Sequence, residues 1–275
     1  MEKQGVTLVA DSGSTKTDWA LCRDGRMEAV VETEGINPVH QTEREIEATL
    51  CRARSLMPLQ PQQVFFYGAG CRDDLLPLMH RLIGQTFQCE AEVASDLLGA
   101  ARALCGRGEG IASILGTGSN SCLYDGEKIV ANVAPLGYIL GDEGSGAALG
   151  RLFLRALLRG ELPQAIADEF GLSASQVIER IYRQPQANRF LATTSPFIRA
   201  HIGDPRLRDI VKQNFRNFFR HCIATYSRPD LPVNVVGSIA AAYESELRET
   251  ANEEGFSVGT VVKKPLEGML RFLQN

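Results

Sequence analysis

An internal sequence repeat restricts the possible folds of this chain more than any other feature. Near the N-terminus, an apolar run ends in the small-residue turn Asp11–Lys16 and leads into a second apolar run. The same order returns in the middle of the chain around Gly116–Asn120. Each copy is followed by an Asp-Gly pair, at residues 24–25 and 125–126, which is a strong hairpin signal between two strands. We therefore expect two copies of a three-stranded unit, with Gly13 aligned on Gly118.

Strand and helix patterns alternate after each copy. Thr42 and Glu45 form a capping-box pattern that predicts a helix. Further strands are expected at 63–67, 90–94 and 232–236, and further helices at 74–83, 96–104 and 265–273. Asp204 and Pro205 suit a helix start, and the apolar stripe behind them continues at helical spacing to Tyr226.

This alternation predicts an α/β protein. The repeat places the division between two related domains near residue 112, giving domains 1–112 and 113–275. The last helix, at 265–273, is assigned to the second domain, with packing against the first domain as the alternative.

Composition excludes several classes of partner. Lys and Arg total 29 against 33 Asp and Glu, a formal charge of −4, so no general attraction to nucleic acid or anionic lipid is expected. No stretch offers the ~20 apolar residues of a membrane span, and the N-terminal residues show no secretory signal. The seven cysteines contain no CxxC pair, which favours a reduced, cytoplasmic protein.

The turn Asp11–Lys16 has the composition of a phosphate-binding turn. Gly13 and its small neighbours let backbone N–H groups converge on an anion. Further donors follow the glycine, namely Ser14, Thr15 and Lys16. Asp11, at the strand end, is a candidate Mg²⁺ ligand, directly or through water. The alternative is an ordinary hairpin turn with an aspartate cap. The second turn, Gly116–Asn120, favours the phosphate interpretation, because a nucleotide held between two domains needs two such turns.

Asp96 is the candidate catalytic residue. It follows a predicted strand and opens a predicted helix. Phosphoryl transfer to a hydroxyl needs a carboxylate that accepts the proton and orients the attacking oxygen. The alternative is structural, with Ser95 or Asp96 acting only as the helix cap.

Taken in order, these motifs resemble the sugar kinase, heat-shock protein 70 and actin superfamily. Within it, the chain resembles N-acetylglucosamine kinases and the related BadF/BadG/BcrA/BcrD ATPase family. Six segments carry the resemblance: Asp11–Lys16, Gly35–Pro38, Ser95-Asp96, Gly116–Asn120, Gly137–Ser145 and Val236–Ser238. The resemblance implies two ribonuclease-H-like (actin-like ATPase) domains with a nucleotide cleft between them. It also implies ATP and Mg²⁺ as cofactors.

The resemblance implies roles for individual residues. Asp96 is the general base and contacts the sugar. The nucleotide is assigned to Asp11, which also holds the metal, and to Gly13, Ser14, Thr15, Lys16, Thr117, Gly118, Gly237 and Ser238. The sugar is assigned to Asn37, Asp96, Asn120, Gly137, Tyr138 and Asp142. Glu143 has no assigned role, and one option is a cap of the helix through Leu149 to Leu158.

We therefore expect ATP-dependent phosphorylation of an amino sugar, with N-acetylglucosamine and its 6-phosphate as first choice. The partner is a small-molecule amino sugar, and a homodimer is possible. One rival is an ATPase activator of an iron–sulfur dehydratase, against which the isolated positions of Cys71 and Cys105 count. The other is a non-catalytic sugar sensor. Only ten residues precede Asp11, so we expect no DNA-binding module before it.

Overall fold

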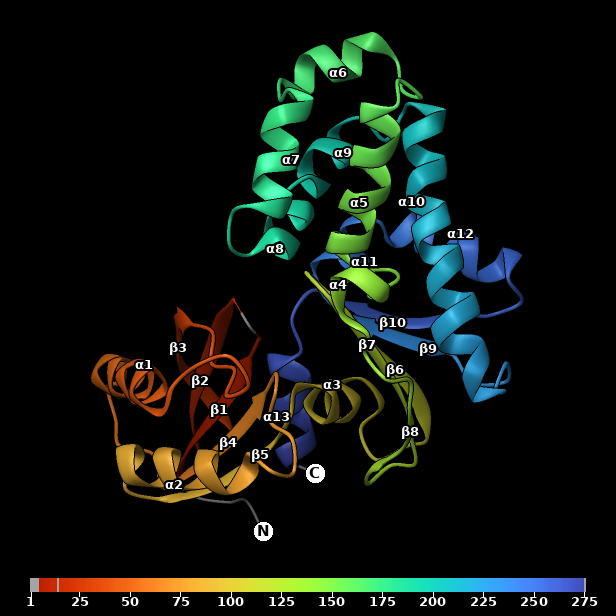
Figure 1. Cartoon of the computed structure of the whole chain (residues 1–275). Helices are drawn as coiled ribbons and strands as arrows, with labels where there is room; N and C mark the ends of the chain where they lie inside the picture. The colour runs from red at the N-terminus through yellow and green to blue at the C-terminus, as the bar shows by residue number, and fades with distance from the viewer. Residues whose placement is uncertain (1–4, 14, 275) are drawn as a thin grey trace. The chain divides into compact units, whose positions relative to one another are not determined.

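The computed structural model describes residues 5–13 and 15–274. By their contacts these residues form two compact units (Figure 1). Unit 1 comprises the chain up to Gly108, the turn at residues 125–128 and the segment from Pro265 onward. Unit 2 comprises residues 109–124 and 129–264. The domain division at residue 112 stays a prediction.

Unit 1 is built on a mixed sheet of order β3-β2-β1-β4-β5. Its strands are β1 (Val6–Ser12), β2 (Lys16–Arg23), β3 (Arg26–Glu34), β4 (Gln63–Gly68) and β5 (Glu90–Ser95). The first three form an antiparallel meander, whereas β4 and β5 run parallel to β1. At the β2–β3 turn, Asp24 and Gly25 both have positive φ, as a tight Asp-Gly hairpin turn requires.

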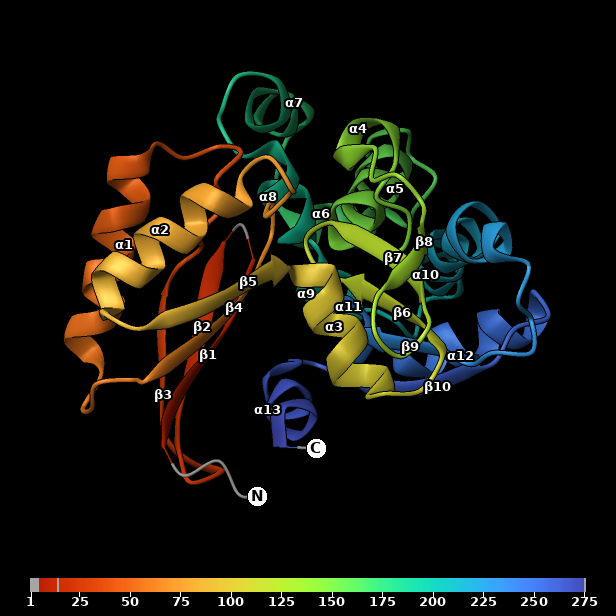
Figure 2. The same ribbon diagram turned by 90° about the horizontal axis from the view of Figure 1, so that it is seen from below.

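Helices cover both faces of the unit 1 sheet, as Figure 2 shows. They are α1 (Glu43–Leu56), α2 (Leu76–Phe87), α3 (Asp96–Cys105) and α13 (Leu266–Gln274). On one face, α1 and α2 pack around Trp19, whose ring centroid lies 5.8 Å from those of Phe66 and Phe87. On the other face, α13 packs against β1 and α3.

Unit 2 repeats the strand order of unit 1. Its sheet runs β10-β9-β6-β7-β8, with an antiparallel meander from β6 to β8 and with β9 parallel to β6 and β10 parallel to β9. The strands are β6 (Gly110–Leu115), β7 (Ser119–Tyr124), β8 (Ile129–Asn132), β9 (Val233–Val236) and β10 (Val258–Val262). The predicted repeat of a three-stranded unit followed by parallel strands is therefore confirmed, and with it the α/β fold class.

The helices of unit 2 surround one large apolar core that includes residues of β6 and β9. They are α4 (Gly137–Leu140), α5 (Gly146–Leu158), α6 (Gln164–Phe170), α7 (Ala174–Tyr182), α8 (Ala187–Ala192), α9 (Ser195–Ala200), α10 (Pro205–Phe218), α11 (Ser238–Ala242) and α12 (Glu244–Glu253). No helix in the described ranges is long and apolar enough to cross a membrane.

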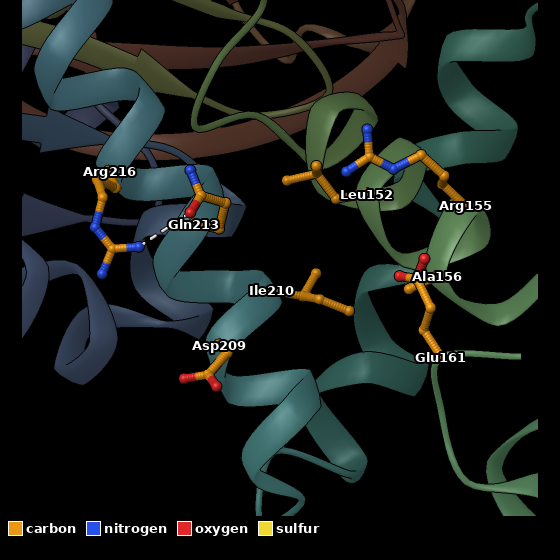
Figure 3. A pocket seen from close by; sticks show the side chains of 8 residues that line it. All are labelled: Leu152, Arg155, Ala156, Glu161, Asp209, Ile210, Gln213 and Arg216. Atoms are coloured by element: carbon orange, nitrogen blue, oxygen red, sulfur yellow. Dashed lines mark hydrogen bonds between the residues drawn. The ribbon is translucent and has the colours of Figure 1, made fainter. Parts of the chain in front are cut away.

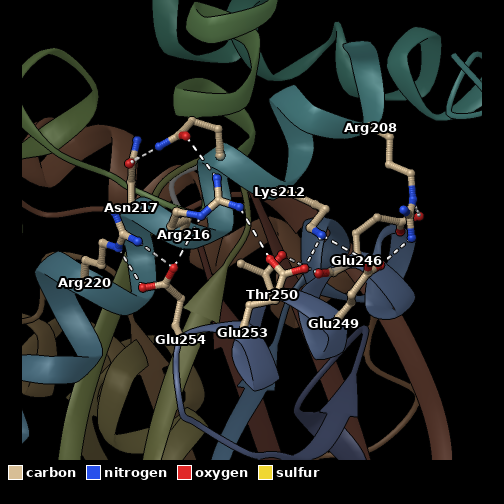
Figure 4. A network of polar contacts seen from close by, with 11 residues as sticks. Arg208, Lys212, Arg216, Asn217, Arg220, Glu246, Glu249, Thr250, Glu253 and Glu254 are labelled. Atoms are coloured by element: carbon tan, nitrogen blue, oxygen red, sulfur yellow. Dashed lines mark hydrogen bonds and ion pairs between the residues drawn. The ribbon is translucent and has the colours of Figure 1, made fainter. Parts of the chain in front are cut away.

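Ion pairs join α10 to α12 along their length (Figure 4). Lys212 on α10 lies 3.0 Å from Glu249 and also contacts Glu253. Arg208 pairs with Glu249 and Arg216 pairs with Glu253. Just beyond α12, Glu254 pairs with Arg216 and Arg220. A network of shared charges holds two helices in register more effectively than an isolated surface pair.

Two predicted helices differ from those observed. The helix predicted at 74–83 begins at Leu76 and extends to Phe87, because a turn at Arg72–Leu75 precedes it. The helix predicted to continue to Tyr226 changes type after Phe218, with a π-helical turn over Phe219–Ile223 and a 3₁₀ turn over Ala224–Tyr226. The π turn adds one residue to the helical repeat, so both Phe218 and Phe219 stay buried.

The contact between α5 and α8 depends on Gly150. A methyl group at this position would lie 2.1 Å from the carbonyl oxygen of Leu191. We predict that Gly150→Ala lowers the free energy of unfolding by about 1–3 kcal/mol or more, the usual cost of overpacking. Gly203→Ala is the control, since a methyl group there meets no atom within 4 Å. Equal urea midpoints for the two variants would contradict the prediction.

Candidate functional site

The parallel strands of unit 1 end in one row. The pairing register joins Ser12 of β1 to Gly68 of β4, and Gly68 to Ser95 of β5. Three segments therefore leave the sheet at the same edge: the turn that starts at Gly13, the loop at residues 69–71, and Asp96. Carboxyl ends of parallel strands are the usual place for ligands in α/β sheets.

Ser12 brings Asn37 to the same edge. The N–H of Ile36 donates to the Ser12 hydroxyl at 3.0 Å. The next residue, Asn37, is buried, and its side-chain oxygen accepts from the N–H of Val39 at 3.0 Å. The loop after β4 lies against it, because a methyl group on Gly70 would fall 2.2 Å from that oxygen. Asn37 therefore has a fixed orientation.

The first turn closes on itself. The N–H of Gly13 donates to the carbonyl of Lys16 at 2.9 Å. The Lys16 ammonium lies 2.8 Å from Glu32 and 3.3 Å from Asp18. Asp18, which the sequence analysis did not single out, is buried and pairs directly across the β1–β2 ladder with Asp11. Thr15 is exposed, and Ser14 lies outside the described residues.

Asp96 is the first residue of α3 but is not its cap. The hydroxyl of Ser95 caps the helix by accepting from the N–H of Leu98. The Asp96 carboxylate accepts from the N–H of Leu97 at 2.8 Å, and no cation within residues 5–13 and 15–274 forms an ion pair with it. Burial raises the pKa of Asp96 to about 6, and the backbone hydrogen bond opposes the shift.

Cys71 is buried against the same edge. A methyl group on Gly68 would lie 2.9 Å from the Cys71 Sγ. Burial raises the pKa of the Cys71 thiol to about 12, and the nearby Asp96 carboxylate adds to this shift. Cys71 is therefore a neutral neighbour of Asp96.

The second turn, in unit 2, is shorter than the first. β6 and β7 pair up to Leu115↔Ser119, which leaves Gly116–Gly118 in the turn, whereas Gly13–Lys16 form the first. Counted from the last strand pairs, Gly116, not Gly118, corresponds to Gly13, so the expected alignment is wrong by two residues. The N–H of Gly116 donates to the carbonyl of Gly118, whereas the N–H groups of Thr117 and Gly118 have no partner among the described residues.

The start of α5 is tied to this turn. The N–H of Gly146 donates to Gly116 at 2.8 Å and the N–H of Ala147 donates to Thr117 at 3.0 Å. Ser145 caps α5 through the N–H of Ala148, so Glu143 is not the helix cap. Asp142 has a left-handed backbone with φ 57°, and its carboxylate approaches the turn, since a methyl group on Gly118 would lie 3.1 Å from Oδ2. Burial raises the pKa of Asp142, and the N–H of Ser119 opposes the shift.

Gly237 lies beside the same turn because β9 is parallel to β6. Its φ is 133°, and a methyl group there would lie 2.2 Å from the carbonyl oxygen of Leu115. Gly237 is therefore required for packing. Ser238, the first residue of α11, is exposed.

A pocket of about 300 Å³ in unit 2 contains two of the predicted sugar contacts, Asn120 and Asp142. The side-chain oxygen of Asn120 accepts from the Asn132 amide at 2.9 Å, which leaves its own amide to donate. Gly137 and Tyr138 do not line this pocket. The pocket is also lined by Glu143, His221 and Cys222, to which the sequence motifs assigned no role. The last two sit in the π-helical turn, which apolar periodicity does not reveal.

A second pocket of unit 2, of about 390 Å³, lies between α5 and α10 (Figure 3). Arg155 and Glu161 face Asp209 and Gln213 across it. It contains none of the predicted site residues. In the part of the chain that the structure describes, no group of three or more His, Cys, Asp or Glu side chains is arranged to hold a metal ion.

No protein-family model and no curated protein matches the chain. A solved structure from Porphyromonas gingivalis, named as a candidate N-acetylglucosamine kinase, is 45% identical and has a TM-score of 0.93, with 98% of this chain and 99% of that chain covered. One from Chromobacterium violaceum, named in the same way, is 21% identical, with a TM-score of 0.74 and coverage of 98% and 99%. The ROK hexokinase of Thermus thermophilus is 17% identical, with a TM-score of 0.51 and coverage of 98% and 97%.

The two more distant structures support the fold alone, which they share over nearly their whole length. The first is a relative close enough to define the family, because the identity extends over almost all of both chains. The chain belongs to the N-acetylglucosamine kinase-like family.

Proposed function

We propose that the protein is an ATP- and Mg²⁺-dependent sugar kinase that phosphorylates N-acetylglucosamine on its 6-hydroxyl. The observation that carries this proposal is Asp96, a carboxylate with a raised pKa and no cation partner among the described residues, at the carboxyl edge of a parallel sheet. The name of the 45% identical relative supports both the reaction and the sugar.

Asp96 would act as the general base. It would accept the proton of the attacking hydroxyl and hold its oxygen for in-line attack on the terminal phosphate. A carboxyl group with a pKa of about 6 is about 90% ionised at pH 7, so it is both available and basic enough for this task. Ser95 supplies the helix cap, and the N–H of Leu97 donates to Oδ1 of Asp96, so the other Asp96 oxygen would face the substrate.

The two turns would bind the nucleotide phosphates. In the second turn, the N–H groups of Thr117 and Gly118 have no partner in the described ranges, so they can donate to phosphate oxygens. The first turn would contact the phosphates through Gly13, Ser14, Thr15 and Lys16. Gly237 and Ser238 are proposed for the adenosine.

Asp11 would hold Mg²⁺. Its carboxylate at the end of β1 lies across the ladder from that of Asp18, and carboxylate oxygens are the donors that Mg²⁺ prefers. The residues present therefore fit the ion. When bound, Mg²⁺ supplies neutralisation of the charge that develops on the phosphates.

The sugar would be held by amide and carboxylate side chains. Asn37, Asn120 and Asp142 offer donors and acceptors for hydroxyl groups. The 300 Å³ pocket beside Asp142 is large enough for a small ligand. The contacts assigned to Gly137 and Tyr138, the cytoplasmic location and the homodimer remain predictions.

The iron–sulfur activator and the non-catalytic sensor are less well supported. The relative that defines the family is named as a kinase. A non-catalytic protein would have no need of an ionisable Asp96 in a position where its charge costs stability.

A panel of acceptors tests the proposed function. We expect ADP release that depends on the sugar, with N-acetylglucosamine as the best acceptor among N-acetylglucosamine, glucosamine and N-acetylmuramic acid. Mass spectrometry and NMR of the product should locate the phosphate on the 6-oxygen. ADP release at the same rate with and without sugar would overturn the proposal.

Asp96→Asn tests the base. We expect kcat to fall about 10²–10⁴-fold while ATP still binds, because the amide keeps the shape but accepts no proton. The variant should also be more stable at pH 7. The folded pKa lies above the unfolded 3.8, so ionisation of Asp96 costs stability as pH rises from 3.8 through 6, up to about 3 kcal/mol at 1.4 kcal/mol per pK unit.

Calorimetric ATP titration and urea unfolding at pH 7 are the measurements for this variant. The gain in stability should vanish below pH 3.8, where Asp96 is protonated in both states. Turnover close to that of the wild type would refute the role of Asp96 as base.

The pH dependence of kcat/KM provides a further prediction. A base must be deprotonated to act, so kcat/KM should fall tenfold per pH unit below an apparent pKa of about 6. Circular dichroism at each pH separates this loss from unfolding. A profile that stays flat down to pH 5, in protein that remains folded, would be incompatible with this prediction.

A further inference from the structure

Asn214 is a polar residue on the apolar face of α10. The buried positions of this helix are Leu207, Val211, Asn214, Phe215 and Phe218. The Asn214 side chain is only 1% exposed. An amide in such surroundings costs free energy unless it is hydrogen-bonded, so a specific role is expected of its partners.

Both partners of Asn214 lie in the loop behind Asp142. Its Oδ1 accepts from the N–H of Gly144 at 3.1 Å, and its Nδ2 donates to the carbonyl of Ser145 at 3.1 Å. The loop is pressed onto α10 at this point, since a methyl group on Gly144 would lie 3.0 Å from Phe218. One side chain of α10 therefore satisfies two backbone groups of this loop.

The loop needs this support because Asp142 is strained. A left-handed backbone is unfavourable for an aspartate, and it persists only where neighbouring contacts enforce it. The N–H of Ser145 donates to the Asp142 carbonyl at 3.0 Å, which closes the loop into a turn. Asn214 holds the far side of this turn.

The other end of the loop is held independently. Gly146 and Ala147 donate to the carbonyls of Gly116 and Thr117, and these bonds do not involve Asn214. Loss of the Asn214 amide would therefore loosen the turn at Asp142 while the connection between α5 and the Gly116–Gly118 turn remains.

We infer that Asn214 is a positioning residue that fixes Asp142 for the sugar acceptor. This inference rests on the proposed function and goes beyond it by assigning acceptor affinity to a residue of α10 that does not line the acceptor pocket. Asn214 acts on the acceptor through Asp142, whereas nucleotide affinity does not depend on it.

The test compares Asn214→Ala with Asn234→Ala. Asn234 is a buried asparagine of the same unit, and its side chain bonds to the backbone of Ile111 in β6, Pro232 and Thr260 in β10. We expect Asn214→Ala to raise the KM and the calorimetric Kd for N-acetylglucosamine at least tenfold, with the KM for ATP changed less than threefold. Asn234→Ala should lower stability and leave both constants within threefold of the wild type.

A second variant guards against misfolding. Asn214→Leu keeps the branching and the number of side-chain heavy atoms but makes neither hydrogen bond, so it should show the same selective loss of acceptor affinity. An acceptor Kd within threefold of the wild type in the folded variants, or an equal rise in both constants, would overturn the inference. Wild-type protein that binds the sugar without phosphorylating it overturns the proposed function alone, and the Kd comparison still decides the role of Asn214. Wild-type protein that binds no sugar overturns both.

Discussion

The parallel pairing of strands is the constraint on which the rest of the structure depends. In unit 1 the register Ser12–Gly68–Ser95 makes three strands end in one row. In unit 2 the pairing of β6 with β9 brings Gly237 beside the end of β6 in the same way. Turns and helix starts that are far apart in sequence therefore meet at the edge of a sheet without needing long loops to reach it.

The edge of unit 1 is occupied by a carboxylate that is costly to bury. Asp96 would be stabilised by a nearby cation, but none pairs with it in the described ranges, and the helix cap is supplied by Ser95 instead. Burial then dominates its pKa, with the neutral thiol of Cys71 on one side. Such an arrangement reduces the stability of the protein and increases the basicity of the carboxylate, a trade-off that is common at catalytic sites.

In unit 2, α10 contributes to both structure and site. Its outer face carries the ion pairs to α12, and its buried face closes the core. Asn214 on that buried face bonds to the loop that contains Asp142, and the π-helical turn at its end directs His221 and Cys222 to the pocket. A helix fixed so firmly from one side is well suited to hold a strained loop on the other.

The repeat, the strand order up to each hairpin and most helix starts were predictable from the sequence, because they depend on local patterns. The capping box of Thr42 and the start of α10 at Pro205 are examples, and both are confirmed. The change from an α-helix to a π-helical turn after Phe218 was not predictable, because burial of two adjacent phenylalanines is a property of the assembled core. The length of the second turn also emerged only from the pairing register.

For the site, sequence motifs identified Asp96, Asn37 and Asp142 as candidates but did not determine their surroundings. Whether Ser95 or Asp96 caps α3 depends on side-chain geometry at the end of β5. The roles of Asp18, Cys71 and Asn214 depend on neighbours that are distant in the chain: Asp11 across a ladder, Asp96 beside a loop, and Gly144 across a helix face. The sequence by itself determined which chemical groups are present and at which strand ends, because strands and turns are encoded locally. Only the tertiary structure decided which of those groups are buried, paired or strained, because burial and pairing arise between segments that meet only in the folded chain.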